Sequence, residues 1–221
     1  MPLLVSMETQ GFRYMCQGCT SLTSASFPNL TTLNGSANFS NAFNGCTHLV
    51  SVDLSKVDTS NSSGTEFQYA FSGCSALTEL NLPKLSKVGD SGLGYLCRNC
   101  SSLQQVNLES LTSTGTYGLQ CAFQNCTSLK TVKLSKLSNV STNNGLTNAF
   151  NGCTALEVVD FSEATKVPVL SNVNAFTNTN STYKIVVPDS LYSSWIAAAN
   201  WSNANIKPHI VKASEYTPTT T

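Results

Sequence analysis

The fold is decided by residues 41–54, which read NAFNGCTHLVSVDL. The same frame returns at residues 121–134 as CAFQNCTSLKTVKL and at residues 148–161 as NAFNGCTALEVVDF. One cysteine marks each copy, at positions 19, 46, 74, 100, 126 and 153, with spacings of 26 to 28 residues. A seventh copy carries Thr179 in place of this marker cysteine. The chain is therefore one unit written seven times with a slightly elastic period.

Self-similarity at a period of roughly 20 to 50 residues is typical of a solenoid, in which each unit stacks on its neighbours. Within each unit, the spacing Leu-x-x-Val-x-Leu of Leu49, Val52 and Leu54 is the leucine-rich-repeat pattern. We therefore predict an α/β fold, a leucine-rich-repeat solenoid. It should have a parallel sheet of about seven short strands, with short helical turns and loops on the other faces.

Each unit is expected to have three parts. The first is a short helical turn such as residues 41–45, where Asn41 can serve as the N-cap. A strand such as residues 50–54 follows, with side chains alternating between core and solvent, and a return loop rich in Ser, Thr and Asn closes the unit. The residue before the marker position is always Gly or Asn, which is typical of a left-handed backbone. These residues are Gly18, Gly45, Gly73, Asn99, Asn125, Gly152 and Asn178.

The unbroken repeat indicates a single domain. We assign residues 1–187 to the solenoid, with about seven units, the first of them truncated because the chain begins in the middle of a repeat. Residues 188–212 are predicted to form a C-terminal cap, since Leu191, Trp195 and Ile196 recur there at helical spacing. Residues 213–221 are predicted to be a disordered tail or linker. We expect an upstream domain of the same protein and leave a downstream one open.

The surface is expected to be neutral and polar. The formal net charge at pH 7 is 0, and only 11% of the residues are charged. Such a chain has no excess of positive charge that would attract nucleic acid. No apolar run approaches the roughly 18 residues that span a bilayer, so direct membrane insertion is not expected. The first residues lack a basic segment followed by an apolar core, so any export signal is expected to lie upstream of this chain.

The six marker cysteines are predicted to be buried free thiols. Successive rungs place identical side chains about 5 Å apart and pointing the same way, whereas a disulfide needs Cβ atoms about 3.8 Å apart and facing each other. Two CxxC motifs, at Cys16–Cys19 and Cys97–Cys100, are interpreted as structural, because the first cysteine of each occupies a column otherwise filled by phenylalanine. A zinc or redox site is the alternative interpretation. Cys121 lies in a variable column and is expected to react first with a thiol reagent.

No catalytic constellation is visible in the sequence. A nucleophilic cysteine needs an adjacent base, and the two histidines, His48 and His209, fall in a loop column and in the predicted cap. Acidic residues are thinly spread, and no pair recurs at a spacing that suggests glycosidase or metal chemistry. We therefore predict a protein that is not an enzyme, without catalytic residues, cofactor or metal.

The exposed face of the parallel sheet is the candidate binding surface, because solenoids commonly dock partners there. Two solvent-facing side-chain columns run along it, and neither contains an aromatic residue or an arginine, the types that anchor tight interfaces. We expect a polar, weak or multivalent contact, such as carbohydrate or extended polypeptide, and the alternative is a merely solvated face. The candidate ligand-binding residues are Ser51, Asp53, Glu79, Asn81, Gln105, Asn107, Thr131, Lys133 and Asp160.

The frame Ala-Phe-x-Gly-Cys-x-x-Leu-x-x-Val-x-Leu, repeated from Cys19 to Val187, resembles the BspA-like family of leucine-rich-repeat bacterial surface proteins. The segments VPDSLY at residues 187–192 and WSNA at residues 201–204 are similar to the ending of that family. The resemblance implies secretion or surface display and, in some members, adhesion to host matrix proteins or other cells. It implies no shared catalytic residues. The units of this chain are longer than the common family pattern, with long Ser, Thr and Asn loops.

The leading hypothesis is a non-enzymatic cell-surface or secreted module that mediates adhesion or binds a protein or carbohydrate ligand. The expected partner is an unidentified host matrix protein, cell-surface protein or glycan. The alternative hypothesis is a structural spacer or display stalk within a larger surface protein.

Overall fold

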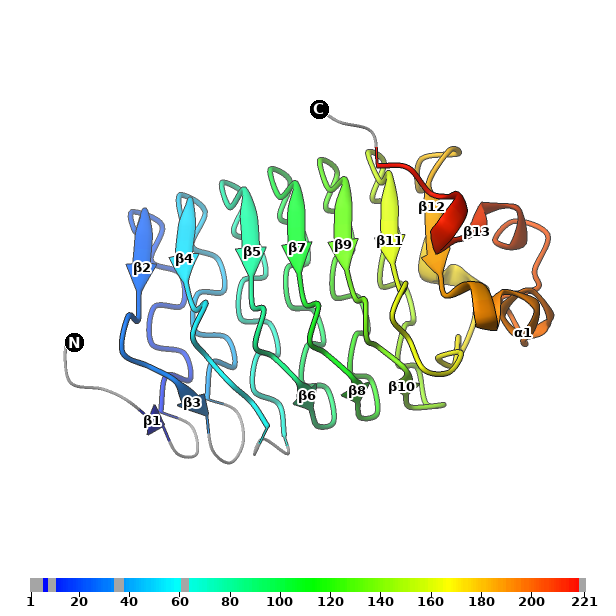
Figure 1. Cartoon of the computed structure of the whole chain (residues 1–221). Coiled ribbons are helices and arrows are strands. Elements are labelled where there is room, and N and C mark those ends of the chain that lie inside the picture. Colours follow the sequence, from blue (N-terminus) through cyan, green and yellow to red (C-terminus); the bar gives the residue numbers. More distant parts are fainter. Residues whose placement is uncertain (1–5, 8–10, 34–37, 61–63, 219–221) are drawn as a thin grey trace.

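The computed structural model describes residues 6–7, 11–33, 38–60 and 64–218, and it shows a solenoid whose parallel strands follow one another in chain order (Figure 1). The predicted leucine-rich-repeat solenoid and its parallel sheet are confirmed. The strands of the main sheet face are β2 (Ser24–Ser26), β4 (Ser51–Asp53), β5 (Glu79–Asn81), β7 (Gln105–Asn107), β9 (Thr131–Lys133), β11 (Val158–Asp160) and β12 (Lys184–Val187).

The register of the main sheet keeps equivalent residues of successive units side by side. Thr131 pairs with Gln105 on one side and with Val158 on the other. The ladder runs from β5 to β12 and continues into β13 (Ile210–Lys212), a strand from the C-terminal region that pairs in parallel with β12. Strands β2 and β4 form a separate parallel pair toward the N-terminal end. From β5 to β12, the side-chain columns read from the sequence are therefore continuous columns of the sheet.

A second, narrower set of strands runs along the lower edge of the solenoid (Figure 1). The sequence predicts only return loops in this region. Stacked copies of one loop bring their backbones to strand spacing, so N–H and C=O groups pair between units even over two residues. The strands are β6 (Lys87–Val88), β8 (Ser113–Thr114) and β10 (Asn139–Val140) in one parallel ladder, and β1 (Ser6–Met7) with β3 (Thr32–Leu33) as a pair.

In the six units with a marker cysteine, the segment before it is a ribbon of turns and not the predicted helical turn; the seventh unit has a short helix there, η1 (Val173–Phe176). Asn41 has a φ of 57° and does not have the extended backbone of an N-cap. Ala42 N donates within its own unit to Phe39 O at 2.9 Å, whereas Phe43 N donates to Ala70 O of the next unit, also at 2.9 Å. About half of the backbone N–H groups in this segment therefore donate their hydrogen bonds to the neighbouring coil. This pairing favours the ribbon over an isolated helix.

The Gly and Asn residues before the marker position have positive φ angles in all seven units, between 57° and 78°, as predicted. A second left-handed column, which the sequence did not reveal, lies four residues earlier. Its members differ in type, because contacts between coils can hold even tyrosine in this strained region. Two of them, Tyr69 and Tyr95, stack with ring centroids 4.5 Å apart. The column contains Tyr14, Asn41, Tyr69, Tyr95, Cys121 and Asn148.

The interior is a continuous stack of like side chains from successive coils. Phe43 stacks on Phe71 with ring centroids 5.5 Å apart, and Phe123 stacks on Phe150 at 5.7 Å. The leucines of the repeat pattern, such as Leu134, are completely buried beside them. Because each coil buries its apolar side chains against its neighbours, the coils stabilise one another along the whole solenoid.

Five of the six marker cysteines are completely buried, but Cys19 is exposed. All nine cysteines of the chain are free thiols, as predicted for the marker column. A buried marker Sγ donates to a carbonyl oxygen of the preceding coil; Cys126 Sγ, for example, lies 2.9 Å from Cys97 O. The prediction of burial is wrong for Cys19, because no described coil precedes the first one and covers it.

The C-terminal residues pack their aromatic side chains against the last coils. Trp195 and Trp201 are completely buried, with ring centroids 5.5 Å apart, and both contact Phe161. The Trp201 indole N–H donates to Pro168 O at 2.8 Å, which satisfies the polar atom of this buried ring. Besides β13, the elements of this end are η1 (Val173–Phe176), η2 (Asp189–Leu191), α1 (Tyr192–Ala197), η3 (Lys207–His209) and η4 (Ala213–Glu215).

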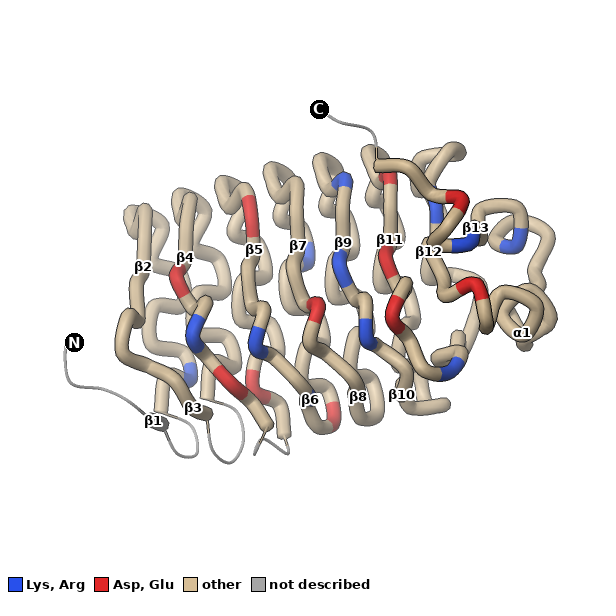
Figure 2. The backbone as a smooth tube through the Cα atoms, in the orientation of Figure 1, with Lys and Arg blue, Asp and Glu red and all other residues tan. Residues whose placement is uncertain are grey.

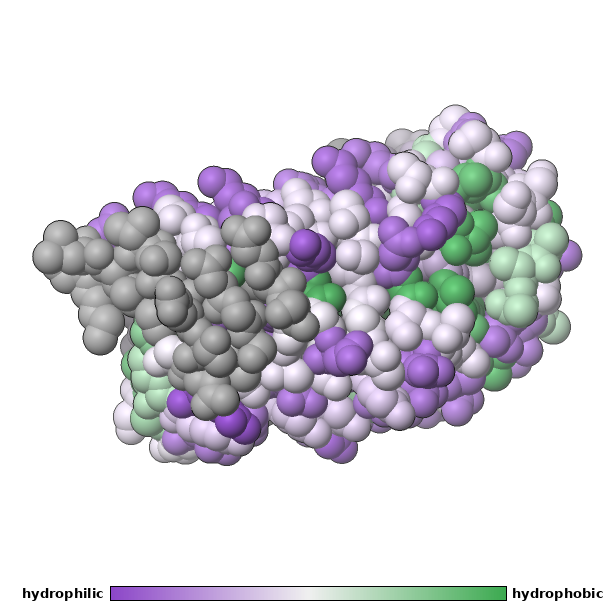
Figure 3. Space-filling view, turned by 90° about the horizontal axis from the view of Figure 1, so that it is seen from below, coloured by the Kyte–Doolittle hydropathy of each residue, from purple (hydrophilic) through white to green (hydrophobic). Residues whose placement is uncertain are grey.

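The surface matches the polar, charge-poor composition. Charged residues are scattered along the solenoid, with acidic and basic positions intermixed over the strands (Figure 2). The face seen from below is mostly hydrophilic or neutral, with small hydrophobic patches toward the end that carries α1 (Figure 3). Within the described residues, no helix combines the length and the apolar character that crossing a membrane requires.

Candidate functional site: a groove on the parallel sheet

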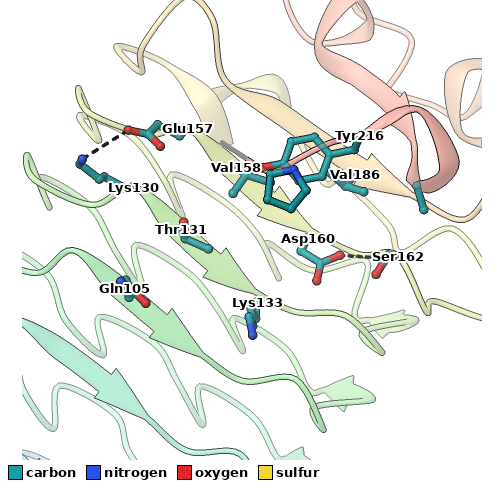
Figure 4. Close-up of a pocket in the computed structure, with 12 residues that line it drawn as sticks. Gln105, Lys130, Thr131, Lys133, Glu157, Val158, Asp160, Ser162, Val186 and Tyr216 are labelled. Atoms are coloured by element: carbon teal, nitrogen blue, oxygen red, sulfur yellow. Dashed lines mark hydrogen bonds and ion pairs between the residues drawn. The ribbon is translucent and has the colours of Figure 1, made fainter. Parts of the chain in front are cut away.

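Two adjoining cavities lie on the exposed face of the main sheet, over strands β5 to β12. The larger has a volume of about 420 Å³ and the smaller about 150 Å³. Both are lined by Gln105, Thr131 and Lys133, so they form one continuous depression, which we call the sheet groove. The groove runs across the strands, because its lining residues come from consecutive strands of the ladder (Figure 4).

The sheet groove brings together seven of the nine residues predicted to bind a ligand. Ser51 and Asp53, on β4, lie outside both of its cavities. The register of the strands explains the grouping, since equivalent positions of neighbouring units point to the same side of the sheet. The seven are Glu79, Asn81, Gln105, Asn107, Thr131, Lys133 and Asp160.

One wall of the larger cavity is formed by residues 213–218, which we call the C-terminal strap. The sequence predicts a disordered tail from residue 213, and this is wrong for the strap. Ser214 N donates to Asp189 Oδ1 at 3.1 Å, and the Ser214 hydroxyl donates to Asp189 Oδ2. Contacts with a residue 25 positions earlier therefore order a segment whose own composition favours disorder. Residues 219–221, the rest of the predicted tail, lie outside the described residues.

The strap gives the sheet face an aromatic side chain that the strand columns lack. Tyr216 lies over Val158 and Val186 in the close-up of the site (Figure 4). These valines are 6% and 3% exposed, although they belong to the two columns that face solvent in the other strands. Two valines in otherwise polar columns are the signal in the sequence that this part of the sheet is covered.

Four charged side chains line the larger cavity, and three of them have partners. Lys130 Nζ lies 3.6 Å from Glu157 Oε1. The Asp160 carboxylate accepts hydrogen bonds from a serine hydroxyl at 2.6 Å and from a backbone N–H at 2.8 Å. Lys133 is exposed, and it makes no ion pair within the part of the chain that the structure describes. Among the described residues, Lys133 is therefore the one cation of the groove without a counter-charge.

The Tyr216 phenol faces acidic side chains. Burial raises the pKa of Tyr216, and the carboxylates of Glu157 and Asp160 raise it further. A tyrosine already titrates well above neutral pH, near 10. The phenol is therefore protonated at neutral pH and can donate a hydrogen bond at the edge of the groove.

Three of the predicted residues have a structural role at the ends of their strands. Side-chain oxygens of Asp53, Asn107 and Asp160 accept the backbone N–H two residues later, at 3.2, 3.1 and 2.8 Å. Such Asx turns favour Asp or Asn where the chain leaves a strand. Hydrogen bonds from Ser55 also lower the pKa of Asp53. The residue types at these three positions are thus explained without a ligand, whereas Lys133 makes no such turn.

The cysteine motifs have no common environment. Cys97 and Cys100 are completely buried, and burial raises the pKa of the Cys97 thiol well above its usual value. Cys19 is exposed and Cys16 is half-buried. Cys121, expected to react first, is only 6% exposed, so this expectation is wrong and Cys19 is the most accessible thiol.

The two histidines lie at structural positions. His48 Nδ1 is 2.7 Å from Thr20 O, and the His209 ring stacks on Tyr183 with centroids 4.0 Å apart. Among residues 6–7, 11–33, 38–60 and 64–218, no group of three or more His, Cys, Asp or Glu side chains is arranged to hold a metal ion.

The repeat matches a family model described as the BspA type leucine rich repeat region. Six copies of the model match, over residues 12–117, 41–167 and 68–207. No curated protein matches the chain.

Two solved structures are similar to the chain. A leucine-rich repeat protein from Bacteroides ovatus ATCC 8483 is 21% identical, with a TM-score of 0.49, over 84% of this chain and 47% of that one. A leucine rich cell surface protein from Faecalibacterium prausnitzii A2-165 is 17% identical, with a TM-score of 0.31, over 90% of this chain and 68% of that one. This chain thus spans about half the length of the Bacteroides protein.

The matched copies extend from residue 12 to residue 207, and they contain the marker cysteines from Cys19 to Cys153 and the strands of the sheet groove. The chain belongs to the BspA-type leucine-rich repeat family.

Proposed function

We propose that this chain is a non-enzymatic, surface-exposed or secreted binding module that holds its ligand in the sheet groove. The partner is a host matrix protein, a cell-surface protein or a glycan. Membership of the BspA-type family and the similarity to a protein named as a cell surface protein support a place at the surface.

The observation that carries this proposal is the groove itself. A flat, solvated sheet would offer only repeated polar columns, whereas here the strap and the strands enclose a cavity of about 420 Å³. Its lining combines an aromatic ring, two buried valines and a lysine that makes no ion pair with any described residue. A concave site that combines apolar surface with a few convergent polar groups is the usual form of a binding site.

The test is binding of the full chain to a panel of extracellular-matrix proteins and to a glycan array. The test variant replaces Gln105, Thr131 and Lys133, which line both cavities, by alanine. The matched control replaces Ser24 and Ser26, which are exposed on the same face but outside the groove. We expect the triple variant to lose binding and the serine variant to retain it. Equal binding by both variants would reject the groove as the site.

A structural spacer is the second candidate function. It is favoured by the Asx turns of Asp53, Asn107 and Asp160, which give these polar residues a role in the fold alone. A spacer predicts that the wild-type chain binds nothing in either panel.

A further inference from the structure

We propose that the sheet groove binds an extended polypeptide that carries a single acidic side chain, with the Lys133 ammonium as the counter-charge. The inference deepens the proposed function and rests on it, because it names the class of ligand for the same groove.

The charge pattern of the groove is the first step. Asp160 is the neighbour of Lys133 across the ladder, but its carboxylate is turned toward Ser135 and Ser162. The other cation and the other carboxylate of the larger cavity, Lys130 and Glu157, pair with each other. Lys133 lines both cavities and is the cation left for a ligand, which favours an anionic group placed over β9.

The acidic groups around the groove limit how acidic the ligand is. Asp160 and Glu157 line the larger cavity, and Glu79 lines the smaller one. A ligand with many negative charges would be repelled by these carboxylates, whereas one carboxylate can reach Lys133 and leave the others solvated. A single acidic residue among neutral ones therefore fits better than a polyanion.

The strap shows that an extended polypeptide fits on this face of the sheet. Tyr216 has a φ of −91° and a ψ of 118°, which is an extended backbone, and its side chain covers Val158 and Val186. Tyr216 and Pro218 then form an apolar wall next to the polar floor of the groove. A second extended segment can lie beside the strap, with apolar side chains against this wall and the carboxylate toward Lys133.

The dimensions of the groove fit a short segment. Its polar floor, outside the part covered by the strap, runs from β5 to β11, three steps of the ladder, or about 14 Å at the usual strand spacing. An extended chain rises about 3.3 Å per residue, so about four to five residues span this length. A peptide of eight residues is long enough to fill it.

The experiment uses N-acetylated and C-amidated octapeptides, so that the peptide ends carry no charge. Each has a fixed central position, which is Glu, Gln or Lys, surrounded by mixtures of Ala, Ser, Thr, Val, Tyr and Pro. The peptides are displayed on an array, which is probed with the labelled full chain at low salt. The affinities of the peptides that bind most strongly are then measured in solution by fluorescence anisotropy. The variants are Lys133→Gln and, as the matched control, Lys136→Gln, an exposed lysine just beyond β9 that does not line the groove.

We expect the Glu peptides to bind more tightly than their Gln and Lys counterparts. Lys133→Gln should weaken their binding about two- to fivefold, as for an exposed ion pair, and remove the preference for Glu. Lys136→Gln should change neither the affinity for the Glu peptides nor the preference for Glu. Tyr216→Ala should weaken the binding of all peptides to the same degree and leave the circular dichroism spectrum of the chain unchanged.

If peptides bind without a preference for Glu, or if the preference persists in Lys133→Gln, the role of Lys133 as the counter-charge is rejected. The proposed function is not affected by that result. Binding of glycans but not of peptides would overturn the polypeptide class, again without harm to the proposed function. The absence of binding to peptides, matrix proteins and glycans alike would overturn both.

Discussion

The left-handed column before the marker position offers a sharp test, because Asn125 has a φ of 60° and an exposed side chain. Its Nδ2 donates to Asn99 Oδ1 of the preceding unit at 3.0 Å. Replacing Asn125 by alanine and by glycine separates the backbone requirement from this hydrogen bond, because both variants lose the bond and only alanine carries a Cβ.

The expected magnitudes follow from this geometry. Alanine in the left-handed region costs roughly 1–2 kcal/mol, and the exposed amide hydrogen bond contributes about 0.5 kcal/mol. Glycine loses the same bond and adds about 0.5–1 kcal/mol through its more flexible unfolded state. Asn125→Ala should therefore lower the free energy of unfolding by about 2 kcal/mol and Asn125→Gly by about 1 kcal/mol.

The assay is urea unfolding followed by circular dichroism, with Gln124→Ala and Gln124→Gly as the control pair. Gln124 is adjacent in the chain and is not among the residues with positive φ. There, alanine should be the more stable replacement by about 0.5–1 kcal/mol. The order of alanine and glycine should thus invert between positions 124 and 125. If Asn125→Ala is as stable as Asn125→Gly, the account of this column is refuted.

Three further outcomes are expected. Cys19 should react with a thiol reagent in the native chain and Cys126 only on unfolding, which mass spectrometry of the labelled peptides would show; rapid labelling of Cys126 would contradict the buried column. Trp201→Ala should cost about 3–5 kcal/mol by leaving a cavity at the C-terminal end, and a loss below about 1 kcal/mol in thermal unfolding would contradict this packing. Burial and two carboxylates raise the pKa of Tyr216. The stabilisation that its protonated side chain contributes is therefore fully present below about pH 10, and it is lost as the pH rises through the raised pKa. Absorbance titration against Tyr216→Phe would detect this, and ionisation at or below about pH 10 would count against it.

The parts of the fold that could be predicted are those that repeat. Leu49, Val52 and Leu54 recur in each unit because every coil buries the same face against its neighbours, so periodicity alone places the strands and the core. Gly45 and Asn125 could be placed in a left-handed column because few residue types tolerate that backbone.

The second left-handed column could not be predicted in this way. Tyr95 and Cys121 have positive φ angles, and neither residue type signals such a backbone. Contacts between coils, such as the stacking of Tyr69 on Tyr95, hold the conformation, and they exist only once the units are stacked. For the same reason, Asn41 was interpreted as a helix cap.

The candidate site was predicted in part. The strand columns placed Gln105, Thr131 and Lys133 on one face, and the groove contains all three. The strap was missed, because Ser214 is ordered by a partner 25 residues away and not by its neighbours in the chain. Local composition describes a segment on its own, so it cannot report such a contact.

The two valines under the strap connect the repeat to the proposed site. Val158 continues a column of polar residues that contains Gln105 and Thr131, and a valine there would be exposed if the tail lay elsewhere. Its burial by Tyr216 makes the strap a constituent of the folded sheet face. A solenoid of like units presents nearly the same surface at each rung, and such a surface selects a ligand poorly. We therefore expect selectivity to come from the features of the groove that do not repeat, the strap over Val158 and Val186 and the Lys133 side chain on β9.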